Sequence, residues 1–141
     1  MQFTLTKGMI AALVFVSGVA LAQVATTEFD FGKHEYDAKC ASCHGPAGKG
    51  DGVNKAFLEK SPSDLTTLSK KNRGEFPYEH VYDVIDGRYA EEHGARDMPS
   101  LGAEYTTQAA GDYMDAPYEP SAYVETRLVA LVDHVRSLQV K

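Results

Sequence analysis

The sequence has no tryptophan and only two cysteines among its 141 residues. Two cysteines cannot form a disulfide-dense scaffold, and they cannot supply a four-cysteine zinc site. Basic residues are in the minority, because 14 lysines and arginines stand against 20 aspartates and glutamates, for a formal net charge of −6. Phosphate groups are bound by clustered basic side chains, so an acidic chain is a poor ligand for nucleic acid. We expect no nucleic-acid partner.

The composition is that of a globular chain. Hydrophobic residues make up 43% of the sequence and charged residues 24%, which is enough apolar material to build a core. A chain of this length corresponds to one domain. No internal repeat and no convincing strand pattern is visible.

The first 22 residues have the layout of a secretory signal peptide. Lys7 is their only charged residue, the stretch 9–19 is almost wholly apolar, and Ala20-Leu21-Ala22 places small residues at a cleavage site. An uncleaved membrane anchor is the alternative, but the apolar run is shorter than the roughly 20 residues that a spanning helix needs. The sequence therefore predicts cleavage after Ala22.

Cleavage would leave residues 23–141 as a single domain. Only Lys7 is lost among the charged groups, so the net charge becomes 13 − 20 = −7. No second apolar run is long enough to span a bilayer. We expect an exported, soluble, periplasmic protein without a membrane span after cleavage.

Both cysteines lie in one motif, Cys40-Ala41-Ser42-Cys43-His44. The C-x-x-C-H pattern is the attachment site of a c-type haem. Two thiols three positions apart on one helical turn can each add to one vinyl group of the same porphyrin, and the adjacent histidine then reaches the iron. The motif predicts one haem c, covalently attached through Cys40 and Cys43, with His44 as an iron ligand.

Three other interpretations of this motif are weaker. A redox C-x-x-C pair sits at a strand-to-helix junction, and no such pattern surrounds this one. A zinc site needs four ligands, and no further cysteine completes it. A disulfide between Cys40 and Cys43 would make a haem-free protein and would leave His44 without a role.

The motif at 40–45 (CASCHG) is followed by a glycine-rich turn at 48–52 (GKGDG). Together they resemble the class I monohaem cytochrome c family, and the resemblance covers most of residues 28–138. It implies an all-α, cytochrome c-like fold whose N- and C-terminal helices cross around one covalently attached haem. It also implies that a backbone carbonyl near Pro62 accepts a hydrogen bond from the other ring nitrogen of His44. An ordinary turn proline is the alternative role for Pro62.

The second axial position has several candidates. Outside the signal peptide the methionines are Met98 and Met114. Met98 precedes Pro99 in a polar loop, which weakens its interpretation as core filler, and the resemblance implies a loop methionine often followed by proline. Met98 is therefore the expected ligand, with Met114, His93 or an open position as alternatives.

Periodic apolar residues predict helices over about 28–41, 77–86 and 122–138. The resemblance implies that the first and last of these helices cross, with Gly32 and Tyr36 against Leu131 and Val135. Residues 99–121 contain two glycines, three tyrosines and two internal prolines. This segment is expected to be a long loop or insertion, with a short helix over 104–110 as one option.

These features predict an electron carrier rather than an enzyme. Two strong axial ligands leave no iron position for oxygen or peroxide, and His/Met ligation raises the reduction potential. The protein would exchange one electron with donor and acceptor proteins, as a free carrier or as the cytochrome subunit of a larger oxidoreductase. Its net negative charge favours partners with a basic patch. The alternative is a haem enzyme or ligand sensor with an open or labile sixth iron site.

Overall fold

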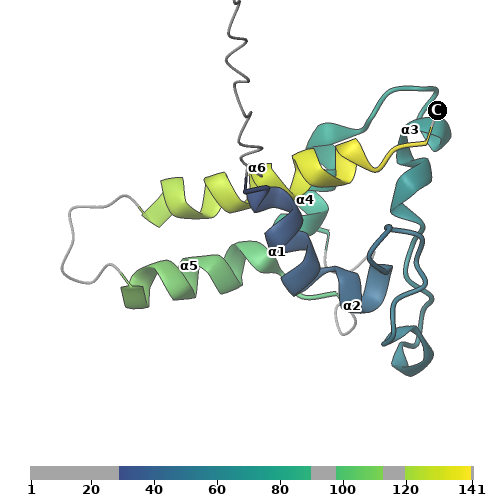
Figure 1. Ribbon diagram of the computed structural model, residues 1–141. Helices are drawn as coiled ribbons and strands as arrows, with labels where there is room; N and C mark the ends of the chain where they lie inside the picture. The colour runs from purple at the N-terminus through teal and green to yellow at the C-terminus, as the bar shows by residue number, and fades with distance from the viewer. Residues whose placement is uncertain (1–28, 90–97, 113–119, 141) are drawn as a thin grey trace, which may run out of the picture.

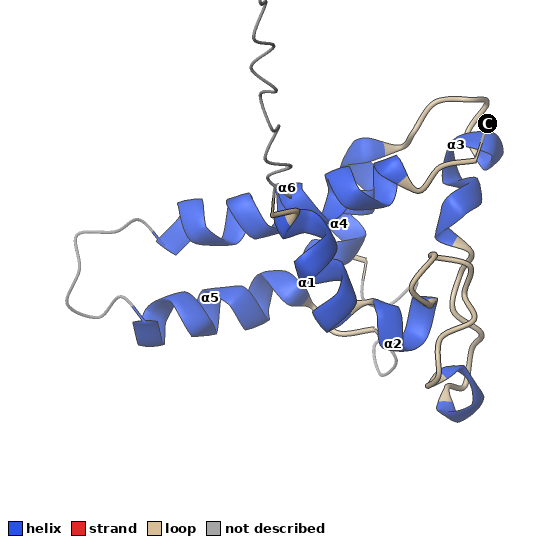
Figure 2. Cartoon of the chain, viewed as in Figure 1, coloured by secondary structure: helices blue, strands red, loops and turns tan. Residues whose placement is uncertain are grey.

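The computed structural model describes residues 29–89, 98–112 and 120–140 (Figures 1 and 2). Within these ranges the secondary structure is entirely helical, which confirms the predicted all-α class. The elements are α1 (Phe31–Lys39), α2 (Ala41–His44), the 3₁₀ helices η1 (Lys55–Phe57) and η2 (Leu65–Thr67), α3 (Leu68–Lys71), α4 (Tyr78–Asp86), α5 (Leu101–Asp112) and α6 (Pro120–Ser137). The predicted signal peptide, Met114 and His93 lie outside the described residues.

The first predicted helix is two helices in the structure. The side chain of Asp30 accepts a hydrogen bond from the backbone N–H of Lys33 (2.8 Å) and so caps the start of α1. At the other end α1 stops at Lys39, and α2 begins at Ala41, with Cys40 between them. The expectation of one helix over 28–41 was therefore too long at both ends, because α1 begins only after its cap Asp30 and Cys40 is the cap between the two helices.

Helices α1 and α6 cross, as the sequence predicted (Figure 1). A Cβ atom added at Gly32 would overlap the backbone carbonyl of Ala130 and lie 3.2 Å from the Cβ of His134. Only a residue without a side chain allows the two backbones to approach this closely. Tyr36, Leu131 and Val135 are buried in the core beside this contact.

His134 is half-buried on the ring of Tyr36, with the two ring centroids 4.9 Å apart. The crossing of α1 and α6 covers this histidine. Burial lowers the pKa of His134 below its usual value, and Asp30 and Asp37 oppose that shift while Lys33 adds to it.

This lowered pKa predicts a loss of stability in mild acid. As the pH falls below about 6.5, the unfolded chain takes up a proton on His134 before the folded chain does. The free energy of unfolding therefore decreases with falling pH until the folded-state pKa is passed. Urea denaturation between about pH 7.5 and pH 5 should show a shallower decline for His134→Gln than for the wild type. If the free energy of unfolding declined equally in both proteins, the pKa of His134 would not be lowered by folding.

Helix α4 closes another side of the core. Pro77 precedes its first residue, and Gly87 ends it in a left-handed conformation with φ of 103°, the pattern expected at a helix C-terminus. Val81 and Ile85 are buried against α6. The prediction of a helix over 77–86 is confirmed.

The segment 99–121 is not a long loop within the described residues. Most of it forms α5, and α6 already begins at Pro120. Leu101, Tyr105 and Ala109 are buried at four-residue intervals along α5, a helical period that the glycines and tyrosines around them obscure. Figure 1 shows α5 and the first half of α6 running side by side away from the rest of the molecule.

A buried ionic cluster joins α5 to the crossing helices. Glu35 is only 5% exposed and forms an ion pair with Arg127. The hydroxyl of Tyr105 donates a hydrogen bond to the same carboxylate at 2.6 Å. The guanidinium of Arg127 also lies over the ring of Tyr123, 4.4 Å from its centroid. The cluster thus ties α1, α5 and α6 together.

Candidate haem-binding site

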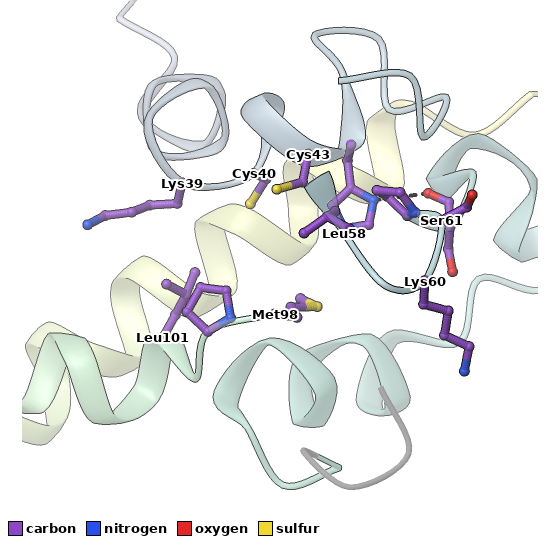
Figure 3. Close-up of a pocket in the computed structure, with 12 residues that line it drawn as sticks. Lys39, Cys40, Cys43, Leu58, Lys60, Ser61, Met98 and Leu101 are labelled. Atoms are coloured by element: carbon purple, nitrogen blue, oxygen red, sulfur yellow. Dashed lines mark hydrogen bonds between the residues drawn. The ribbon is translucent and has the colours of Figure 1, made fainter. Parts of the chain in front are cut away.

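A cavity of about 210 Å³ lies between α2, the loop after η1 and the segment that leads into α5. Cys40, Cys43 and His44 line it from the α2 side, and Met98 lines it from the segment before α5. Figure 3 shows Met98 across the cavity from the two cysteines. The tertiary structure therefore brings all four predicted site residues to one place.

The short helix α2 places the two cysteines one turn apart. The backbone carbonyl of Cys40 accepts hydrogen bonds from the N–H groups of Cys43 (3.1 Å) and His44 (2.8 Å). Gly45 then ends the helix with φ of 80°, and the buried hydroxyl of Tyr36 donates to its carbonyl at 2.7 Å. Both thiols and the imidazole are thus presented from a single turn.

The loop after the motif folds back onto this turn. The N–H of Gly52 donates to the carbonyl of Cys43 (3.0 Å), and the N–H of Asn54 donates to that of Ser42 (2.9 Å). A side chain at Gly52 would overlap these two carbonyls. The glycine-rich turn therefore lies close against the backbone of the motif.

The imidazole of His44 is held by the chain itself. Its Nδ1 lies 3.0 Å from the carbonyl oxygen of Ser63. A carbonyl can only accept a hydrogen bond, so Nδ1 carries the proton and Nε2 keeps its lone pair. A backbone carbonyl near Pro62 was expected to accept this hydrogen bond, and in the structure the acceptor is the carbonyl of the next residue, Ser63. Burial lowers the pKa of His44, and the bond to Ser63 partly opposes this shift, so the ring is neutral and can act as a ligand at neutral pH.

The thiols do not have the character of a redox pair. Both cysteines are free, and burial, followed by the neighbouring Cys43, raises the pKa of Cys40 to about 12. Reactive C-x-x-C cysteines have lowered pKa values that favour the thiolate. Across the described residues the motif follows a helix rather than a strand, and no group of three or more His, Cys, Asp or Glu side chains is arranged to hold a metal ion.

Several apolar residues around the cavity were not expected from the sequence. Leu58 and Leu101 line it. Leu65 and Leu68 are partly buried against the hydrophobic core. The four-residue period of apolar residues along α5 could have indicated that Leu101 faces the interior. No regular pattern in residues 53–60 indicates that Leu58 lines the cavity.

The donor set and its surroundings fit a covalently attached haem. The cavity offers two thiols on one turn, a neutral imidazole with a fixed ring, a thioether on the facing wall and apolar side chains between them. Histidine and methionine are the axial pair of electron-transfer cytochromes. A bound haem would supply an iron that changes its oxidation state by one electron.

Comparison with known proteins agrees with this fit. The profile of the family described as "Cytochrome c" matches residues 29–139, which include the motif, the facing segment and both crossing helices. No curated protein and no solved structure matches the chain. The family match, the helical fold and the arrangement of the motif together show that the chain belongs to the cytochrome c family.

Proposed function

We propose that this protein is an exported electron carrier that holds one haem c through Cys40 and Cys43, with His44 and Met98 as the axial iron ligands. The observation that carries the proposal is the position of Met98. Residues 90–97 lie outside the described part of the chain, yet Met98 itself lines the same cavity as the cysteine–histidine turn.

The residues of the cavity have separate tasks in this proposal. Cys40 and Cys43 tether the cofactor from one helical turn, so the carrier keeps it through repeated oxidation and reduction. Ser63 orients the His44 ring and raises its donor strength. The thioether of Met98 stabilises ferrous iron better than a second imidazole and so raises the reduction potential. Leu58 and Leu101 lower the local polarity.

Export to the periplasm is part of the same proposal. Haem attachment to C-x-x-C-H motifs takes place outside the cytoplasm, which agrees with the predicted signal peptide at 1–22. In the described ranges, no helix combines the length and the apolar character of a membrane span. The intact mass of protein recovered from the periplasm should equal residues 23–141 plus one haem. The mass of a haem-free chain that has lost two hydrogens would indicate a disulfide instead.

Optical spectroscopy tests the ligation directly. We expect the oxidised protein, matured with a c-type haem attachment system, to show the far-red charge-transfer band of Met-ligated ferric haem. Met98→Ala should abolish this band, because no thioether would then face His44 across the cavity. Met114→Ala is the matched control and should retain it.

A different spectrum would change the functional assignment. If the native ferrous protein is high-spin and binds carbon monoxide without denaturation, the sixth position is open, and the protein is a haem enzyme or ligand sensor. If Met114→Ala rather than Met98→Ala removes the far-red band, electron transfer stands but the ligand assignment is wrong.

A further inference from the structure

One side chain joins the end of α6 to the segment that follows the cavity loop. The side-chain amide of Gln139 donates to the backbone carbonyls of Leu65 (2.7 Å) and Val135 (2.9 Å), and its oxygen accepts from the N–H of Ser69 (2.9 Å). Figure 1 shows the chain beyond α6 reaching α3. Gln139 therefore links the last turn of α6 to both η2 and α3.

Backbone groups add to this connection. The N–H of Val140 donates to the carbonyl of Thr66 (2.9 Å), a residue that is only 6% exposed. Ser69 is the second residue of α3, and the first N–H groups of a helix have no acceptor within it. The oxygen of Gln139 supplies that acceptor. We name the contacts of Gln139 and Val140 with residues 65–69 the clasp.

The clasp holds the turn that begins at Ser63. The carboxylate of Asp64 accepts hydrogen bonds from the N–H (2.8 Å) and the hydroxyl (2.6 Å) of Thr66, which fixes the backbone between them. The carbonyl of Ser63 directly precedes this turn and lies 3.0 Å from Nδ1 of His44. The position of that carbonyl is therefore linked to the contacts of Thr66 with the clasp.

The other side of Ser63 is held locally. The carbonyl of Pro62 lies against Gly50, where an added Cβ atom would overlap it, and the N–H of Gly50 donates to the carbonyl of His44 (2.8 Å). The clasp instead comes from Gln139, which is 74 positions from Leu65. Ser63 itself is exposed, so its carbonyl is positioned by these contacts of its neighbours rather than by burial.

We propose that Gln139 is a positioning residue for the axial ligand His44, because the clasp keeps the Ser63 carbonyl within hydrogen-bond distance of Nδ1. This inference rests on the proposed electron-carrier function. A carbonyl that accepts the Nδ1 hydrogen bond makes the imidazole a stronger donor. A stronger donor stabilises ferric iron more than ferrous iron, so displacement of the Ser63 carbonyl would raise the reduction potential.

Gln139→Leu tests the clasp, because leucine has neither the donor nor the acceptor of the amide. In the reduced holoprotein, NMR should show the Nδ1 proton of His44 exchanging with solvent about tenfold faster than in the wild type, since two hydrogen bonds to the 65–69 segment are lost. A spectroelectrochemical titration should give a higher reduction potential. Gln139→Asn, whose amide is one methylene shorter, should shift both quantities in the same direction.

Ile85→Val is the control for a general loss of stability. Ile85 is buried in α4 and is not among the described residues that line the cavity. The substitution should lower the midpoint of thermal unfolding, as the removal of a buried methylene does. It should leave the reduction potential and the exchange rate of the Nδ1 proton at their wild-type values.

The outcomes separate the two proposals. If Gln139→Leu lowers the unfolding midpoint but changes neither the potential nor the exchange rate, Gln139 is only structural and the inference is wrong. It is also wrong if Ile85→Val shifts both quantities as far as Gln139→Leu does. The electron-carrier function fails separately, if the native ferrous wild type binds carbon monoxide without denaturation. In that case the exchange rate of the Nδ1 proton still tests the clasp.

Discussion

Replacement of Arg127 by methionine is expected to lower the free energy of unfolding by about 3–5 kcal/mol. The substitution leaves the buried carboxylate of Glu35 without its cationic partner, and among the described residues the hydroxyl of Tyr105 is then the one remaining side-chain donor to it. A charge in a site that is 5% exposed cannot recover its lost hydration from water. Guanidinium denaturation of the holoprotein would measure the change.

Two comparison variants distinguish the cost of leaving a buried charge unpaired from the cost of removing any arginine. Arg136→Met removes a pair with Asp133 whose side chains are 59% and 46% exposed, and it should cost less than about 1 kcal/mol. The double variant Glu35→Leu/Arg127→Met removes both charges and should recover most of the lost stability. If Arg127→Met costs no more than Arg136→Met, the cluster does not hold α5 in place.

The second large effect is expected at the helix crossing. Gly32→Ala should lower the free energy of unfolding by about 1–3 kcal/mol, even though alanine is the better helix former. The added methyl group meets the backbone carbonyl of Ala130, and a carbonyl within a helix cannot rotate away. The two helices would have to separate, which loosens the packing of Tyr36 against α6. Thermal unfolding followed by circular dichroism would report the loss.

Gly111 provides the matched control for this substitution. It lies in α5, and a Cβ added there would have nothing within 4 Å. Gly111→Ala should therefore raise stability by up to about 1 kcal/mol, the helix propensity difference between the two residues. A similar gain from Gly32→Ala would mean that α1 and α6 are farther apart than the structure places them.

Corrections to the sequence-based predictions occur where partners are distant along the chain. Helix α5 was not foreseen in full because Gly102, Gly111 and the tyrosines around them are typical of loops. Gly102 lies where α5 packs closely on Asp86 of α4, and a side chain at this position would overlap Asp86. Tyr105 is buried in the core, where its hydroxyl donates a hydrogen bond to Glu35. Glu35 and Arg127 are 92 positions apart, and no local pattern relates them.

What the sequence by itself determined is the chemistry carried by neighbouring residues. Five consecutive residues, 40–44, indicate haem attachment because the spacing of two thiols and an imidazole on one turn is a local property of the backbone. The crossing of α1 and α6 was also predictable, from Gly32 and from the apolar stripe of the last helix, together with the family resemblance.

Only the tertiary structure decided how distant segments meet. It brought Met98 to the cavity, selected the Ser63 carbonyl for His44 and joined Glu35 to Arg127. Each of these depends on which elements pack together, and packing is set by the burial of apolar surface over the whole chain rather than by local spacing.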